Sequence, residues 1–207
     1  RAAALLLAGV QRVDFVNDNA GRELLFDLAP ADLLLRQGWA RQVVFHLKDR
    51  PFFVSDAMPQ DVRAIIDLLQ AGPSHPADNQ GSNLPPAQAL GRRLEEHLAA
   101  GRLLLDSAPF WTSCLMFRQM PPELAGKLAE SDLVILKGDV NYRRLLDDRH
   151  WPHTARLEEI AVYFPAPFLA LRTLKGEIMV GLGPGQAEEL AAQDPTWLIN
   201  GKRGIIQ

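Results

Sequence analysis

The chain has 207 residues, of which 47% are hydrophobic and 23% are charged, the balance of an ordinary globular protein with one well-buried core. The formal net charge of -3 excludes the strongly basic surface of a general nucleic-acid-binding protein. The single cysteine, Cys114, excludes an intrachain disulfide, and no Cys/His spacing fits structural zinc. We therefore expect a cytoplasmic or nucleocytoplasmic protein, not a secreted one, with neither nucleic acid nor membrane as a partner.

The chain begins at Arg1 with a short apolar run that ends at Gly9. This run is too short to span a bilayer, and no small-residue cleavage pattern follows it. We interpret residues 1–12 as the tail of a missing helical N-terminal region and residues 13–207 as the main domain. The missing segment, as a separate chain, is a candidate partner.

Short β-like runs alternate with longer amphipathic runs along the main domain. We expect strands at 13–16, 42–47, 52–55, 102–105, 132–136 and 168–172, and short apolar ends at 197–199 and 204–206. We expect helices from 21 onwards and at 61–70, 87–100, 121–130 and 186–193. This alternation predicts an α/β fold, a largely parallel sheet with helices on both faces in three layers (α/β/α).

Three local features modify this pattern. Pro30 falls inside the first helix of the main domain and should kink or divide it. The segment 72–86 contains four prolines and two glycines, which predicts a flexible surface loop. Cys114 lies in the apolar stretch 111–117, where we expect core packing.

Three apolar strands of the predicted sheet are each followed by an acidic residue: Asp18, Asp56 and Asp139. Ligands of open α/β sheets bind beyond the carboxyl ends of the strands, so we expect these acids to converge on one site. Two carboxylates together with the amide oxygen of Asn19 form a hard ligand set, which suits Mg²⁺ or Mn²⁺. For each acid alone, a turn or a helix cap is the structural alternative.

Basic side chains also follow the predicted strand ends, at Lys137, Arg143, Arg144, Arg172 and Lys175. Arg and Lys beside a metal neutralise and orient a phosphate ester. The alternative is a solvated basic turn.

Five short sequence blocks contain most of the candidate site residues. They are 18–23 (DNAGRE), 54–56 (VSD), 137–143 (KGDVNYR), 172–177 (RTLKGE) and 201–207 (GKRGIIQ). In this order they resemble the metal-dependent damage-control phosphatases, in the branch marked by an RTxK motif. That branch is also described as acidic-residue, or protein-glutamate, methyltransferase-like. The resemblance covers residues 13–207.

The resemblance implies a phosphatase of small phosphometabolites, with fructose 1-phosphate and fructose 6-phosphate as family substrates and Mn²⁺, Co²⁺, Ni²⁺ or Mg²⁺ as cofactor. Carried over by position, Asp18, Asn19 and Asp56 match the metal ligands, and with Asp139 they form the catalytic set. The residues that match substrate-binding positions are Asp18, Asn19, Asp139, Val140, Asn141, Tyr142, Arg143, Arg172 and Lys175. Family members also carry a helical N-terminal region.

Two other functions stay open. One is an S-adenosylmethionine-dependent carboxyl methyltransferase, although the first strand is followed by DNAG and by no glycine-rich cofactor loop. The other is a non-catalytic module that binds sugar phosphates, which would show binding without phosphate release.

Overall fold

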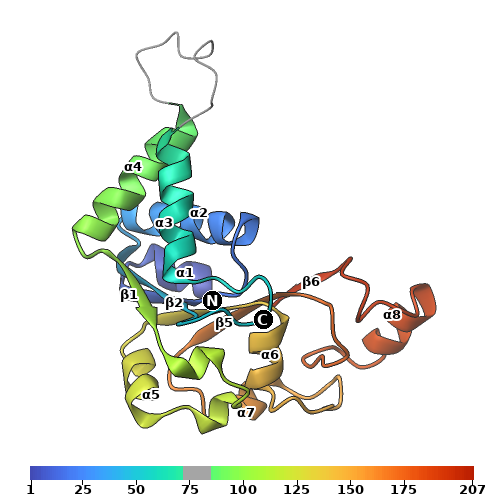
Figure 1. The fold of residues 1–207 in the computed structure, drawn as a ribbon. Helices are drawn as coiled ribbons and strands as arrows, with labels where there is room; N and C mark the ends of the chain where they lie inside the picture. The colour runs from blue at the N-terminus through green and yellow to red at the C-terminus, as the bar shows by residue number, and fades with distance from the viewer. Residues whose placement is uncertain (72–84) are drawn as a thin grey trace. The chain divides into compact units, whose positions relative to one another are not determined.

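The computed structural model describes residues 1–71 and 85–207, and Figure 1 shows their helices and strands. The predicted loop at 72–86 lies almost entirely outside the described residues. The chain divides into two compact units, Arg1–Thr112 and Ser113–Gln207, and we describe each by itself.

Three parallel strands form the sheet of the first unit, in the order β3-β2-β1. They are β1 (Val10–Val16), β2 (Ala40–Leu47) and β3 (Leu103–Ser107). Val16 of β1 pairs with His46 of β2, and His46 pairs with Asp106 of β3. This register brings the carboxyl ends of β1 and β2 to the same edge, where the segments with predicted site residues begin.

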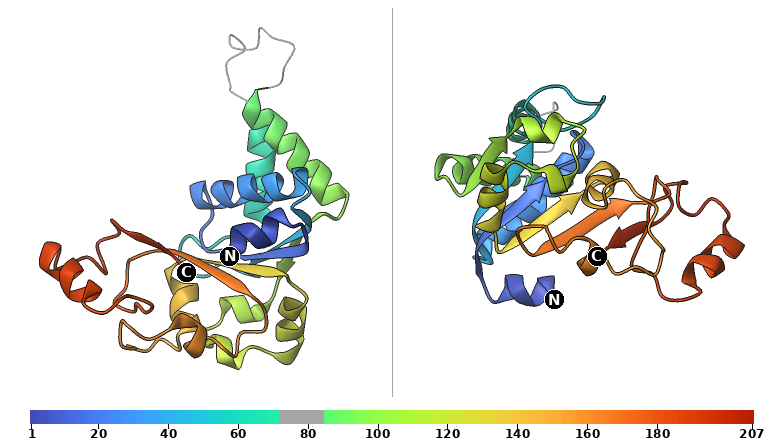
Figure 2. Two further views of the ribbon diagram at one scale, coloured as in Figure 1. Left: turned by 180° about the vertical axis from the view of Figure 1, so that it is seen from behind. Right: turned by 90° about the horizontal axis from the view of Figure 1, so that it is seen from below.

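The helices of the first unit are α1 (Ala2–Leu7), α2 (Arg22–Arg36), α3 (Pro59–Ala71), α4 (Pro86–Ala99) and the short 3-10 helix η2 (Pro109–Thr112). Helices α2, α3 and α4 pack on the sheet and on one another. Helices α3 and α4 run side by side (Figures 1 and 2). Their backbones approach closely at Gly91, where an added Cβ would lie 2.8 Å from the Cβ of Leu69. Only glycine fits that contact.

Helix α2 is continuous through Pro30, so this proline does not divide the helix; the alternative expectation of a kink stays a prediction. Proline at this position removes the hydrogen bond to the carbonyl of Phe26, one turn earlier. Both Pro30 and Phe26 are exposed, so water can hydrogen-bond the freed carbonyl and the helix survives.

The strand predicted at 52–55 is also wrong, because these residues form a turn with one isolated bridge at Asp56. Phe53 and Val54 are exposed, and Phe53 has a φ of 49°, a left-handed conformation that no strand adopts. The aromatic and β-branched composition indicated a buried strand, but no neighbouring strand pairs with it. Asp56 therefore follows a turn and not a strand.

The second unit contains three further strands: β4 (Leu133–Lys137), β5 (Phe168–Thr173) and β6 (Gly204–Ile206). Strand β5 pairs in parallel with β4 and antiparallel with β6. The helices are η3 (Phe117–Gln119), α5 (Pro122–Ala129), α6 (Asp139–Leu145), α7 (Leu157–Ile160) and α8 (Gln186–Gln193). Helix α8 packs through Ala187 and Leu190 on a small core of Leu174, Met179 and Trp197.

Parallel pairing with intervening helices in both units confirms the predicted α/β class and its largely parallel sheet. The segment 197–199 forms turns, whereas 204–206 is a strand. Cys114 is exposed, so the expectation of core packing is wrong for this residue. Within the described residues, no helix has the length and apolar character needed to cross a bilayer.

Candidate functional site

Two segments of the first unit meet just beyond the carboxyl end of β1. Asn19 and Asp56 form an isolated antiparallel bridge. The amide of Ala57 donates to the carbonyl of Asp18 at 2.9 Å, and the amide of Ala20 donates to the carbonyl of Ser55 at 2.7 Å. The backbone itself therefore brings the three predicted metal ligands, Asp18, Asn19 and Asp56, onto adjacent segments.

The side chain of Asn19 links the acidic residues around it. Its Nδ2 donates to Oδ2 of Asp18 and to Oε2 of Glu23, both at 2.9 Å. Its Oδ1 accepts from the hydroxyl of Ser55 at 2.5 Å. Glu23 and Ser55 were not singled out from the sequence as site residues, although both lie inside the blocks that carry the family resemblance.

Lys48 is the cation of this cluster. Its Nζ lies 3.2 Å from Oδ1 of Asp56, with side-chain exposures of 3% and 7%. Burial raises the pKa of Asp56, and the nearby Lys48 ammonium opposes that rise. The sequence analysis missed Lys48, because the run Lys48–Arg50 just after a strand is typical of a solvated turn. The sequence did contain one indication: Lys48 directly follows an apolar strand and precedes the predicted metal ligand Asp56.

We tested whether this cluster suits a divalent metal ion. Asp18, Asn19 and Asp56 offer two carboxylates and an amide oxygen, the hard donors that Mg²⁺ and Mn²⁺ prefer. No group of three His, Cys, Asp or Glu side chains in the described part of the chain is arranged around a metal position. The predicted set does not need such a group, because one of its three ligands is an amide. The donor chemistry fits, with water as the remaining ligands.

A second cluster forms in the second unit around Asp139 and Arg172. Asp139 is the first residue of α6, directly after β4 and Gly138. Arg172 lies on β5 with a fully buried side chain, and its Nη2 is 3.3 Å from Oδ1 of Asp139. Its guanidinium also lies 4.3 Å from the ring centroid of Tyr142. Burial lowers the pKa of Arg172, and Asp139 opposes that shift.

Gly176 closes this cluster from the segment after β5. An added Cβ at Gly176 would lie 3.0 Å from Oδ2 of Asp139, so a larger residue would push the carboxylate. The carbonyl of Gly176 accepts a hydrogen bond from Nη2 of Arg172 at 3.2 Å. Asp139 is thus held between a buried cation and a glycine at which an added side chain would displace the carboxylate.

The predicted substrate-binding turn 139–143 is a helix, the first part of α6. Gly138 is the N-cap of this helix, so the residues predicted to form a flexible turn are helical. Asn141 and Tyr142 are buried; the Asn141 side chain donates to the carbonyl of Lys137 at 2.8 Å. Val140 is half-buried.

The other predicted cations differ in accessibility. Arg143 is exposed and forms a bidentate ion pair with Asp148: its Nε lies 2.7 Å from Oδ1 and its Nη2 lies 3.0 Å from Oδ2. Arg144 is buried and donates to the carbonyl of Leu115 at 2.8 Å, a structural role. Lys175, the lysine of the RTxK segment, is exposed to solvent.

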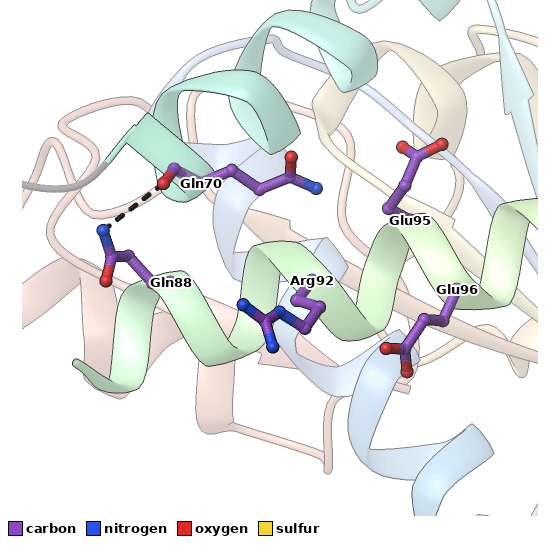
Figure 3. Close-up of a pocket in the computed structure, with 5 residues that line it drawn as sticks. All are labelled: Gln70, Gln88, Arg92, Glu95 and Glu96. Atoms are coloured by element: carbon purple, nitrogen blue, oxygen red, sulfur yellow. Dashed lines mark hydrogen bonds between the residues drawn. The ribbon is translucent and has the colours of Figure 1, made fainter. Parts of the chain in front are cut away.

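A polar groove of about 400 Å³ lies elsewhere in the first unit, between α3 and α4. Figure 3 shows its lining residues, with Gln88 donating to the backbone oxygen of Gln70 at 3.3 Å. The remaining lining residues are Arg92, Glu95 and Glu96, all from α4. None of the predicted site residues lines this groove, so it does not support the predicted chemistry.

Comparison with known proteins identifies the family to which this chain belongs. Residues 2–190 match the model of the damage-control phosphatase ARMT1-like domain. The chain belongs to this family. The match confirms the family resemblance and covers both the Asn19–Asp56 bridge and the Asp139–Arg172 cluster.

Curated relatives named damage-control phosphatase ARMT1 are similar over most of this ARMT1-like domain. The zebrafish (Danio rerio) protein is 40% identical over 95% of this chain and 42% of its own length. The mouse (Mus musculus) protein is 39% identical over 96% of this chain and 44% of its own length, and the human protein is 37% identical over 97% and 44%. The chain therefore spans less than half the length of these relatives.

A solved structure is also similar, that of a DUF89 family protein from Pyrococcus horikoshii. The TM-score is 0.46 with 17% identity, and the match covers 87% of this chain and 43% of that one.

Proposed function

We propose that this ARMT1-like domain is a divalent-metal-dependent phosphatase of small phosphorylated metabolites. Sugar phosphates, with fructose 1-phosphate and fructose 6-phosphate first, are the proposed substrates. The observation that supports the proposal is the bridge between Asn19 and Asp56, because it brings together two of the proposed oxygen ligands from distant positions in the sequence. Family membership supports the reaction class.

The first cluster would hold the metal. Asp18, Asn19 and Asp56 supply the ligand oxygens, and the hydrogen bonds of Asn19 to Asp18 and Ser55 fix the orientation of the amide. When bound, a divalent ion supplies charge neutralisation at a phosphoryl oxygen and lowers the pKa of a coordinated water. Hydrogen-bonded ligands of this kind are pre-organised, which lowers the cost of binding.

The second cluster supplies the proposed contacts to substrate. Lys175 is an exposed cation and is proposed to bind the phosphate as a mobile point charge. Asp139 is proposed to orient or deprotonate the attacking water, with its carboxylate held by Arg172. Asp18, Asn19, Val140 and Arg143 are proposed to contact the substrate as well, with Arg143 on the sugar hydroxyls. Asn141 and Tyr142 are buried, so they are proposed to act only by holding the start of α6 in place.

The test is release of inorganic phosphate from a panel of sugar phosphates. Each substrate is assayed with EDTA and after addition of Mn²⁺, Co²⁺, Ni²⁺ or Mg²⁺. The proposal predicts release that EDTA abolishes and a divalent ion restores, and a loss of at least about a thousandfold in kcat for Asp56→Ala with an unchanged circular dichroism spectrum.

Two outcomes would overturn the proposal. Binding of sugar phosphate without release by the metal-loaded, folded protein would favour a non-catalytic binding module. Methyl transfer from S-adenosylmethionine to a protein carboxyl group, insensitive to EDTA, would favour the methyltransferase.

A further inference from the structure

A buried lysine ammonium occupies the immediate surroundings of a proposed metal ligand. Nζ of Lys48 is 3.2 Å from Oδ1 of Asp56, and the two side chains are only 3% and 7% exposed. Asp56 is thus paired with the positive charge of Lys48. It is also a proposed ligand of a divalent metal ion, which is positively charged as well. At such burial, solvent screens the two charges only weakly.

The backbone keeps Lys48 close to this carboxylate. The amide of Lys48 donates to the carbonyl of Ala57 at 2.9 Å, and the amide of Ala57 donates to the backbone carbonyl of Asp18 at 2.9 Å. The ammonium also lies 5.8 Å from the ring centroid of Phe52. Because the backbone of Lys48 is hydrogen-bonded to Ala57, the residue after Asp56, the base of this side chain stays next to the ligand set.

We propose that Lys48 is the resident counter-ion of Asp56 and limits the affinity of this site for divalent metal. This inference rests on the proposed function, because it assumes that Asp18, Asn19 and Asp56 hold the ion. Lys48 stabilises the metal-free site by neutralising a buried carboxylate. In the loaded site its charge repels the bound ion, so the metal exchanges more readily than the ligands alone would allow.

The direction in which Lys48→Met changes the affinity for Mn²⁺ distinguishes this role from a structural one. Lys48→Met keeps the length of the side chain and removes its charge, which leaves Asp56 without this counter-ion. If Lys48 limits affinity, the variant binds Mn²⁺ at least about tenfold more tightly than the wild type. If Lys48 only orients Asp56, the same variant binds Mn²⁺ more weakly.

The experiment is titration calorimetry with Mn²⁺ alone, on the metal-stripped chain and three variants, without substrate. Lys48→Arg retains the charge and should bind within about threefold of the wild type. Arg50→Met is the matched control: Arg50 is two residues away with a side chain 64% exposed, so its loss should leave the dissociation constant unchanged. Asp56→Asn should bind at least about tenfold more weakly.

Folding of the key variant is followed in parallel. Should Lys48→Met be partly unfolded without metal, its dissociation constant is corrected for the folded fraction measured by circular dichroism, and the corrected value should still be at least about tenfold tighter than that of the wild type. A corrected affinity equal to or weaker than that of the wild type would overturn the inference.

The outcomes also separate the inference from the proposed function. Unchanged or weaker binding by Lys48→Met, with binding still lost in Asp56→Asn, would overturn the role of Lys48 and leave the metal site intact. A wild-type chain with no Mn²⁺ binding would overturn both.

Discussion

At the scale of single residues, Lys175 and Arg172 of the RTxK segment have different environments and different proposed roles. Arg172 is buried against Asp139, whereas Lys175 is exposed. Lys175→Ala should raise KM for a sugar phosphate at least about tenfold and change kcat less, because it removes a phosphate-binding charge. Steady-state phosphate release measures both constants, with exposed Lys202→Ala as the control. Equal constants in Lys175→Ala and wild type would refute this role.

Gly176 tests the importance of the position of Asp139. In Gly176→Ala the new Cβ lies 3.0 Å from Oδ2 of Asp139, so the carboxylate must shift by a few tenths of an ångström. We expect kcat to fall about tenfold and Tm to change by less than about 3 °C. Gly183→Ala is the control, since its nearest contact would be an ordinary 3.7 Å. Full activity in Gly176→Ala would show that the position of Asp139 is not critical.

Sequence order indicated Asp18, Asn19 and Asp139, because each follows the carboxyl end of a strand. Lys48 and Ser55 were missed for a physical reason. Their contacts depend on the bridge between two segments, and such pairing is not encoded in local periodicity.

At the scale of elements, α2 carries a correctable defect at Pro30. Proline in a helix interior costs about 3 kcal/mol relative to alanine, part of which is recovered through a less flexible unfolded chain. Pro30→Ala restores the hydrogen bond to Phe26 on an exposed face. It should raise the free energy of unfolding by about 1–2 kcal/mol, measured by urea denaturation. A variant no more stable than the wild type would contradict this account of α2.

Strands β1 and β2 are joined by a buried polar network at Asp14. Its carboxylate accepts two hydrogen bonds from Arg12 at 2.7 Å and lies 2.7 Å from Nε2 of His46. Burial alone would raise the pKa of Asp14, but the bonds from His46 and Arg12 outweigh it and hold the pKa below the ordinary 3.8.

The depressed pKa of Asp14 gives a pH dependence with a definite sign. The unfolded chain takes up its proton first, so the stabilisation is complete above pH 3.8 and is lost as the pH falls through the folded-state pKa. Urea unfolding between pH 6 and about 3 should show the difference between wild type and Asp14→Asn shrinking with acid. Two parallel stability curves would contradict the assignment.

Most elements follow from their sequence pattern, since the short apolar runs of β1, β2 and β4 match the length and composition of buried strands. The turn at 52–55 and the helix at 139–143 do not. In the first, apolar composition resembled a strand but Phe53 and Val54 are exposed. In the second, a Gly-Asp pair resembled a turn although it begins α6.

At the scale of the whole molecule, each of the two compact units contains one cluster of the proposed site residues. The first unit holds the acidic cluster of Asp18 and Asp56 with its counter-ion Lys48. The second unit holds the basic positions Arg172 and Lys175 beside Asp139.

The most direct test of the central claim is the initial rate of phosphate release from fructose 1-phosphate as a function of Mn²⁺ concentration. Wild type and Asp18→Ala are compared after both are shown to be folded by circular dichroism. The account predicts a saturable, EDTA-sensitive rate in the wild type and a loss of at least about a thousandfold in Asp18→Ala. Equal rates in the two proteins, or a wild-type rate that is indifferent to Mn²⁺ and EDTA, would contradict it.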